Sequence, residues 1–142
     1  GTQLPTLGGV WVLTPHAGEL ARLSGRSGRE VLAEPFEVTI NTARELDAVV
    51  CLKSHVTIIA SPDGRYAVVD GMNPSMGTGG AGDVLAGMIA GLLARGCAAF
   101  DAAAAGCSIH DALGKRLFAE RGFFLAEDLV DEVSREMARY LA

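Results

Sequence analysis

The chain has 142 residues, of which 49% are hydrophobic and 20% charged, and its formal net charge is −5. This size and composition predict one globular domain with a buried core. Because the chain is acidic and has no cluster of Lys or Arg, we expect neither nucleic acid nor an anionic membrane surface as a partner. Any bound phosphate must therefore be held by backbone groups rather than by a basic patch.

The three cysteines, Cys51, Cys97 and Cys107, lie far apart and show no C-x-x-C spacing. This pattern argues against a disulfide framework or a zinc site and predicts reduced thiols in the core. The sequence also has no apolar run of ~18 residues and no basic-then-apolar leader pattern. We therefore expect a cytoplasmic protein that does not span a membrane.

Two short apolar runs in the first half of the chain predict buried strands. They are Val-Trp-Val-Leu at 10–13 and the β-branched run Ala-Val-Val-Cys-Leu at 48–52. Between them the pattern predicts a short helix over 19–25 that ends at Gly25, an irregular stretch over 26–36 and a helix over 38–46.

Polar residues follow both predicted strands. The segment Thr-Pro-His-Ala-Gly-Glu, which contains His16, follows the first strand, and Lys-Ser-His-Val-Thr at 53–57 follows the second. In open α/β sheets, ligands bind at the carboxyl ends of the strands. These residues are therefore candidate ligand contacts, although a solvated loop histidine and a solvated hairpin turn explain them about as well.

The middle of the chain predicts a β-hairpin, and its end predicts two amphipathic helices. The runs 57–61 and 66–69 flank a Pro-Asp-Gly turn signal at 62–64. Helical spacing of apolar residues continues from Phe100 to about Glu120 and again from Leu129 to Leu141. His110 and Asp111 lie inside the first of these helices, and we interpret them as mostly structural.

The most informative stretch is Gly-Thr-Gly-Gly-Ala-Gly-Asp at 77–83. Its glycines predict a loop, and apolar residues at 84, 85, 88, 89, 92 and 93 predict a buried helix that begins near Ala81. The first N–H groups of a helix have no internal partners and carry the positive end of the helix dipole. The stretch therefore predicts an anion site, and phosphate is the favoured anion.

Asp83 adds chemistry to this anion site. A carboxylate there could accept a proton from a hydroxyl while the neighbouring N–H groups stabilise a transferring phosphoryl group. Such chemistry is kinase-like. The alternative is that Asp83 is only a favourable acid at a helix start, and that the glycines form only a tight turn.

Three motifs together resemble one known family. They are T-P-H-A-G-E at 14–19, K-S-H-V-T at 53–57 and N-P-S-M-G-T-G-G-A-G-D-V-L-A-G at 73–87. In this order they resemble the carboxyl-terminal half of the ADP- or ATP-dependent NAD(P)H-hydrate dehydratases, from about Val10 to the end of the chain. The resemblance implies a ribokinase-like three-layer α/β/α sandwich, with a mostly parallel central sheet plus a β-hairpin. Residues 1–142 would then be the carboxyl-terminal part of one nucleotide-dependent domain.

The same resemblance implies a reaction and a set of site residues. The substrate would be hydrated NADH or NADPH, and the reaction would use ADP or ATP with Mg²⁺ carried on the phosphates rather than in a protein-only metal cage. Asp83 would be the catalytic base and a substrate contact, and His16 would also contact the hydrated dinucleotide. The implied anion hole is Gly79, Gly80, Ala81 and Gly82. The implied nucleotide contacts are Gly82, Lys53, Ser54, His55, Val56 and Thr57.

Two departures from the family pattern lead to further expectations. The family usually has glycine where Ser54 stands, and the related domain is nearly twice as long as this chain. We therefore expect the strand at 10–13 to have an open side, covered by self-association or by a missing amino-terminal half. The alternative functions are a small-molecule kinase of the same superfamily, which shares a shorter glycine-aspartate loop, and a non-catalytic nucleotide-binding remnant.

Overall fold

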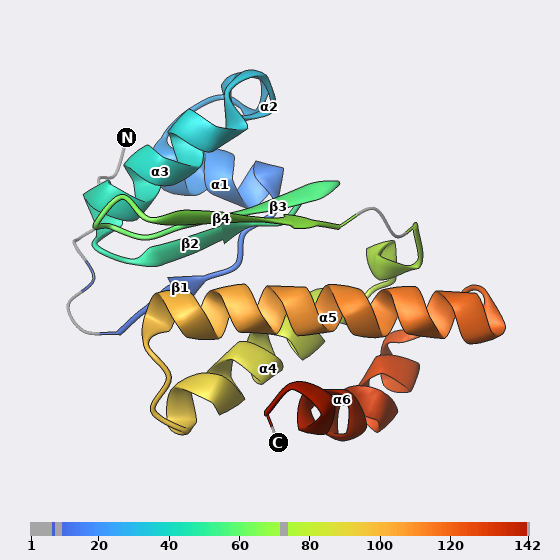
Figure 1. The fold of residues 1–142 in the computed structure, drawn as a ribbon. Coiled ribbons are helices and arrows are strands. Elements are labelled where there is room, and N and C mark those ends of the chain that lie inside the picture. Colours follow the sequence, from blue (N-terminus) through green and yellow to red (C-terminus); the bar gives the residue numbers. More distant parts are fainter. Residues whose placement is uncertain (1–6, 8–9, 72–73, 142) are drawn as a thin grey trace.

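A four-stranded sheet lies between two layers of helices in the computed structural model (Figure 1). The structure describes residue 7, residues 10–71 and residues 74–141. The elements are β1 (Val12–Leu13), α1 (Ala17–Ser24), α2 (Gly28–Ala33), α3 (Pro35–Leu46), β2 (Val49–Leu52), β3 (Val56–Ala60), β4 (Tyr66–Asp70), a 3-10 helix (Pro74–Gly77), α4 (Ala81–Ala94), α5 (Ala99–Arg121) and α6 (Ala126–Leu141). Helices α1–α3 cover one face of the sheet and α4–α6 lie on the other, which confirms the expected three layers.

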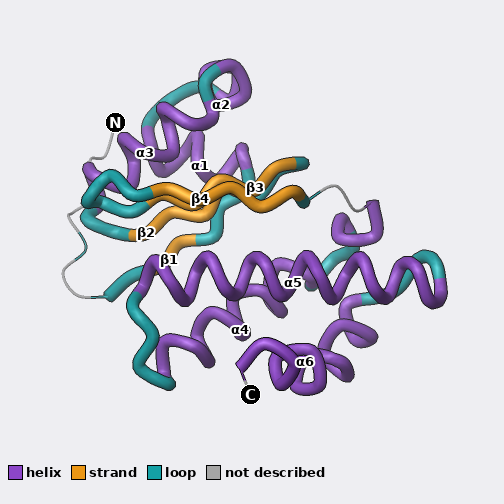
Figure 2. Tube along the Cα trace, in the orientation of Figure 1, coloured by secondary structure: helices purple, strands orange, loops and turns teal. Residues whose placement is uncertain are grey.

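The strands follow the order β1-β2-β3-β4, with β1 at one edge of the described sheet (Figure 2). Strand β1 pairs with β2 in parallel, whereas β2–β3 and β3–β4 are antiparallel. The predicted hairpin is confirmed. The expectation of a mostly parallel sheet does not hold for these four strands, because only one of their three pairings is parallel. The connections 53–55 and 61–65 are too short for the crossover that parallel neighbours need.

Strand β2 is buried along its whole length because helices cover both of its faces. Val50 and Leu52 pack with the core beneath α1–α3, and Val49 and Cys51 pack with the core beneath α4 and α5. This alternation is the two-residue period of a strand. Strand β4 at the other edge alternates between exposed and half-buried residues, as expected of an edge strand.

Two helices occupy the stretch 26–36 that was expected to be irregular. Ser27 caps α2, because its Oγ accepts from the N–H of Glu30 at 3.2 Å while Glu30 Oε2 accepts from the N–H of Ser27 at 2.8 Å. Pro35 then opens α3 at its first position. The prediction was wrong because a capping box and a first-turn proline are start signals, which outweigh the polar composition of this stretch.

The cysteines are all free, as predicted, but they do not share one environment. Cys51 and Cys107 are buried, and a hydrogen bond with Cys107, together with burial, raises the pKa of the Cys51 thiol far above its usual range. Cys97 is exposed in the connection between α4 and α5, so its assignment to the core is corrected. Among the described helices, none combines the length and apolar character needed to cross a membrane.

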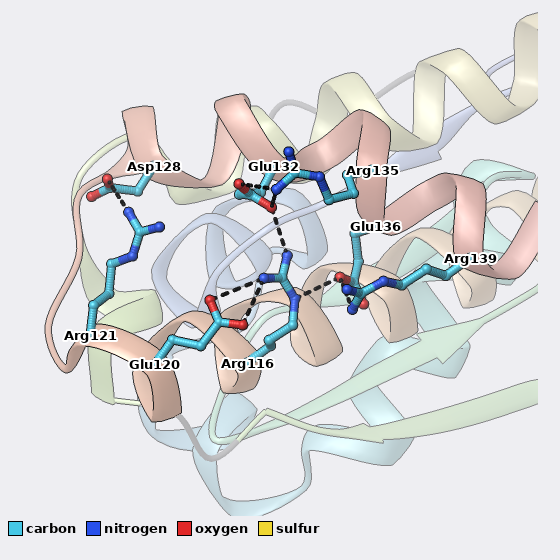
Figure 3. Close-up of polar contacts among 8 residues, drawn as sticks. All are labelled: Arg116, Glu120, Arg121, Asp128, Glu132, Arg135, Glu136 and Arg139. Carbon is cyan, nitrogen blue, oxygen red and sulfur yellow. Dashed lines mark hydrogen bonds and ion pairs between the residues drawn. The ribbon is translucent and has the colours of Figure 1, made fainter.

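Helix α6 is joined to α5 by a network of ion pairs (Figure 3). Arg116 of α5 lies at its centre and donates to Glu120, Glu132 and Glu136 at 2.9–3.0 Å. The side chain of Glu136 is only 3% exposed and also accepts from Arg139 at 3.2 Å. The network fixes α6 beside α5, and the amino-terminal end of α6 in turn contacts the glycine loop described below.

Candidate functional site

The amino-terminal end of α4 follows the glycine loop, as the sequence predicts. Gly80 is the residue before the helix, and no side chain caps the helix there. The N–H groups of Asp83 and Val84 donate to the Gly80 carbonyl at 3.0 and 3.1 Å. The Gly82 N–H has no acceptor within the part of the chain that the structure describes. A free donor therefore lies at the positive end of the helix dipole, which is the arrangement that binds anions.

Gly80 cannot be exchanged for a larger residue without strain. Its φ angle is +94°, a conformation that side-chain-bearing residues rarely adopt, and a Cβ there would lie 2.9 Å from the Cβ of Ala126. Ala126 is the first residue of α6. Helix α6 therefore packs against one side of the glycine loop. The first turn of α4, which carries the exposed residue Asp83, remains accessible.

Lys53 brings a positive charge to the same place. Its N–H donates to the carbonyl of Pro15 at 2.8 Å, and His16 and Lys53 form a parallel bridge just beyond β1 and β2. A Cβ built on Gly82 would lie 3.0 Å from Lys53 Nζ, so the ammonium group faces the start of α4. The absence of a side chain at Gly82 makes this approach possible. One cation and one free N–H therefore converge on the same space.

A pocket of about 120 Å³ opens beside this point. Residues from three parts of the chain meet there: the turn after β2, the start of α4 and the middle of α5. The end of β4 closes one side, where a Cβ on Gly71 would lie 3.2 Å from the carbonyl oxygens of Ser54 and His55. The lining includes Lys53, Ser54, Thr57, Ala81, Gly82 and Leu85.

The predicted nucleotide segment divides at this pocket. Lys53, Ser54 and Thr57 line it, whereas His55 and Val56 are exposed residues outside its lining. Ser54, at the position where glycine is expected in related proteins, lies in the lining with its side chain. The segment 53–57 therefore lines the pocket with three of its five residues.

His110 and Asp111 of α5 also line the pocket, although the sequence pattern suggested a structural role. His110 is 8% exposed, and its Nε2 atom has no hydrogen-bond partner among the described residues. The same holds for Oδ1 of Asp111. Buried polar atoms are normally paired, so two unpaired atoms in one pocket point to a ligand. The available sequence signal was the polar pair itself, which interrupts an apolar helix face between Cys107 and Leu113.

The pKa of His110 leads to a prediction about acid stability. Burial lowers this pKa from 6.5 to about 4, with the Lys53 charge adding to the effect and a hydrogen bond with the Ala81 backbone opposing it. The unfolded state therefore binds the proton first, and stability is lost as the pH falls from 6.5 towards 4. The loss should reach about 3 kcal/mol. Urea unfolding across this range should show a shallower pH dependence for His110→Gln, and an unchanged slope would contradict the assignment.

His16 and Asp83 occupy different settings. His16 caps α1, because its Nδ1 accepts from the N–H groups of Gly18 and Glu19 at 3.0 and 3.3 Å, and its side chain is 59% exposed. Asp83 is exposed on the first turn of α4, and its carboxylate makes no hydrogen bond or ion pair with a described residue. The side chain is thus positioned to meet a group that approaches the start of α4 from solvent.

A metal site formed by protein side chains is not found in the described part of the chain. No group of three or more His, Cys, Asp or Glu side chains there lies close enough to hold an ion.

Comparison with known proteins identifies the lineage of this site. A sequence profile described as NAD(P)H-hydrate dehydratase matches residues 2–135. The chain belongs to the NAD(P)H-hydrate dehydratase family. One relative, the ADP-dependent (S)-NAD(P)H-hydrate dehydratase of Xanthomonas campestris, is 43% identical over 129 residues, which are 89% of this chain and 45% of the relative. The chain thus spans less than half of that relative, and it spans 24% of the bifunctional NAD(P)H-hydrate repair enzyme of Moorella thermoacetica, to which it is 43% identical over 125 residues.

Solved structures agree with this assignment. The ADP/ATP-dependent NAD(P)H-hydrate dehydratase of Bacillus subtilis, co-crystallised with ATP/Mg²⁺, superposes with a TM-score of 0.85 at 31% identity, over 97% of this chain and 50% of that one. A ribokinase-like superfamily protein of Enterococcus faecalis superposes with a TM-score of 0.82 at 29% identity, over 96% of this chain and 47% of that one. The expected ribokinase-like fold is therefore confirmed.

Proposed function

We propose that this chain carries the nucleotide site and the catalytic acid-base residue of an enzyme that dehydrates hydrated NADH or NADPH at the expense of ADP or ATP. The observation that supports this most directly is the unpaired Gly82 N–H at the start of α4, with Lys53 Nζ beside it. Together with the family membership, it favours a phosphate-bearing ligand at this point. Residues 1–142 would then form the carboxyl-terminal part of one nucleotide-dependent domain.

The residues present fit a nucleotide. Gly79, Gly80, Ala81 and Gly82 would form the anion hole, and Lys53 would neutralise charge on the phosphates. The remaining acceptor atoms of the pocket suit a nucleoside, because they can accept from its N–H or O–H groups. Mg²⁺ would be held by phosphate oxygens and water, as is usual for this ion at nucleotide sites.

Asp83 would act on the substrate rather than on the nucleotide. The nucleotide supplies a phosphoryl group that converts the hydroxyl of the hydrated ring into a leaving group. Asp83 would take the proton of that hydroxyl as the hydroxyl oxygen bonds to the terminal phosphorus and the bond from this phosphorus to the bridging oxygen breaks, so that AMP leaves from ADP or ADP leaves from ATP. The N–H groups at the start of α4 would hold the negative charge on the transferring phosphoryl group. Loss of inorganic phosphate and a proton from the phosphorylated ring would then give the reduced cofactor. His16, exposed and beside Lys53 in the backbone bridge, would contact the hydrated dinucleotide.

The direct test is to incubate the protein with hydrated NADH and Mg²⁺, with ADP, with ATP or without nucleotide. Recovery of the absorbance of the reduced ring, only when a nucleotide is present, is the expected result. Consumption of nucleotide without recovery would instead show a kinase that stops at a phosphorylated product. Binding of nucleotide without turnover of either compound would show a non-catalytic remnant.

We also propose that the open edge of β1 is covered by a second polypeptide segment. Within the described sheet β1 pairs on one side only, with β2. An uncovered strand edge invites pairing with another strand. Light scattering of the purified chain should therefore show self-association, or association with a separately supplied amino-terminal half. A stable monomer that also turns over hydrated cofactor unaided would refute this proposal.

A further inference from the structure

The pocket contains two polar atoms that the proposed phosphate chemistry does not use. They are Nε2 of His110 and Oδ1 of Asp111, both buried and both without a partner among the described residues. His110 is more than nine-tenths buried, at 8% exposure. An unpaired buried polar atom destabilises the unliganded protein, so a ligand that pairs with both atoms gains affinity from them.

Asp111 is held so that one oxygen remains for the pocket. Its Oδ2 pairs with Lys115 Nζ at 2.8 Å, and the same ammonium group donates to the Asp70 carbonyl at 3.0 Å. Lys115 therefore fixes the Asp111 carboxylate between α5 and the end of β4. The remaining atom, Oδ1, can only accept a hydrogen bond, because a carboxylate has no donor.

His110 presents an acceptor as well. Burial lowers its pKa to about 4, so the ring is neutral near pH 7 and carries one N–H and one lone pair. Of the two ring nitrogens, Nε2 is the one that is buried without a partner among the described residues. In the tautomer that carries its proton on Nδ1, Nε2 offers its lone pair to the pocket.

The walls around the two acceptors are mainly apolar. Val69, Met76, Leu85 and Cys107 line the pocket, whose volume of about 120 Å³ is suited to one ring-sized group. Apolar walls with a few placed polar atoms are typical of sites for flat heterocycles. A ribose, which has polar groups on several sides, would leave some of them against these apolar walls.

We propose that His110 and Asp111 accept hydrogen bonds from the 6-amino group of the adenine base and thereby select adenine over 6-oxo purine nucleotides. This inference rests on the proposed function, since it takes the ligand to be a nucleotide. An amino group offers two hydrogens, one for each acceptor. A 6-oxo group would instead place a third acceptor against the two, and all would remain unpaired.

The first experiment compares ADP with IDP, which carries a 6-oxo purine, on the 142-residue chain by calorimetry at pH 7.5. We expect IDP to bind about 10- to 100-fold more weakly than ADP. Equal affinities would overturn the inference but leave the proposed nucleotide site intact. Absence of binding by either nucleotide would overturn both.

The second experiment uses Asp111→Asn, which keeps the shape of the side chain but supplies an amide donor. The ratio of ADP to IDP affinity should then fall to about threefold or less, because the amide N–H can pair with the 6-oxo group. Asp101→Asn, an exposed position on the same helix, is the matched control and should keep the wild-type ratio. An unchanged ratio in Asp111→Asn would overturn the inference. If that variant does not fold, the wild-type comparison alone decides.

Discussion

Asp83→Asn is expected to lower turnover of hydrated cofactor by about 10²–10⁴-fold and to change nucleotide affinity by less than about threefold. The amide keeps the size and much of the hydrogen bonding of the carboxylate but cannot take a proton. The N–H of Asp83, which donates to the Gly80 carbonyl at 3.0 Å, is unaffected by the exchange. The anion site at the start of α4 therefore stays intact while the base is removed.

Steady-state kinetics and calorimetry on the same preparation separate these two effects. Asp131→Asn, which changes an exposed carboxylate on α6, is the control and should retain full activity. Equal turnover in Asp83→Asn and wild type would reassign Asp83 to a structural role at the helix start. A parallel loss of nucleotide affinity would instead indicate that its carboxylate contacts the nucleotide or its metal ion.

The glycine loop and the helix after it were predictable because several local rules coincide there. Glycines at 77, 79, 80 and 82 favour a loop, and the apolar spacing beyond them predicts a helix, in which the structure includes Gly82. The positive φ of Gly80 and the start of α4 at Ala81 agree with that prediction. Likewise, a Pro-Asp-Gly signal between two apolar runs was enough to predict the β3–β4 hairpin.

Other features depend on contacts between distant segments, which local pattern does not encode. The approach of Lys53 Nζ to Gly82 depends on how β2 and α4 are placed relative to each other in the fold. Lys115 pairs with Oδ2 of Asp111, and Oδ1 stays without a partner among the described residues because it lies at the pocket. His110 is ambiguous for the same reason. The sequence shows a polar residue on an apolar helix face, and the fold is needed to show that its Nε2 has no partner in the described part of the chain.

The position of α6 is a further feature that sequence patterns could not supply. Its charged residues predict an exposed amphipathic helix, yet Glu136 is 2% exposed and lies in the contact with α5. The first residue of the same helix touches Gly80 across the glycine loop. The ion pairs of Figure 3 therefore bear on the site as well as on stability, because they hold the element that supports the loop.

Arg116→Met is accordingly expected to lower the free energy of unfolding by about 2–4 kcal/mol, measured by urea denaturation near pH 7. Methionine keeps an apolar stem of similar length but removes the cation that pairs with Glu136 at 2.9 Å. Among the described residues, Glu136 would then retain Arg139 alone, at 3.2 Å and 52% exposed, as a partner for its buried carboxylate. Leaving a buried charge poorly paired is what makes the loss large.

The matched control is Arg121→Met, on the same helix. Arg121 pairs with Asp128 at 3.0 Å, but both side chains are substantially exposed, at 47% and 33%, so this exchange should cost less than about 1 kcal/mol. Acid should reduce the difference between Arg116→Met and wild type. The hydrogen bond with Arg116 lowers the pKa of Glu132, so the stabilisation is present above the unfolded-state pKa and is lost as the pH falls through the folded-state value. Equal losses for the two arginine variants would show that burial of the Glu136 pair does not distinguish it from a surface ion pair.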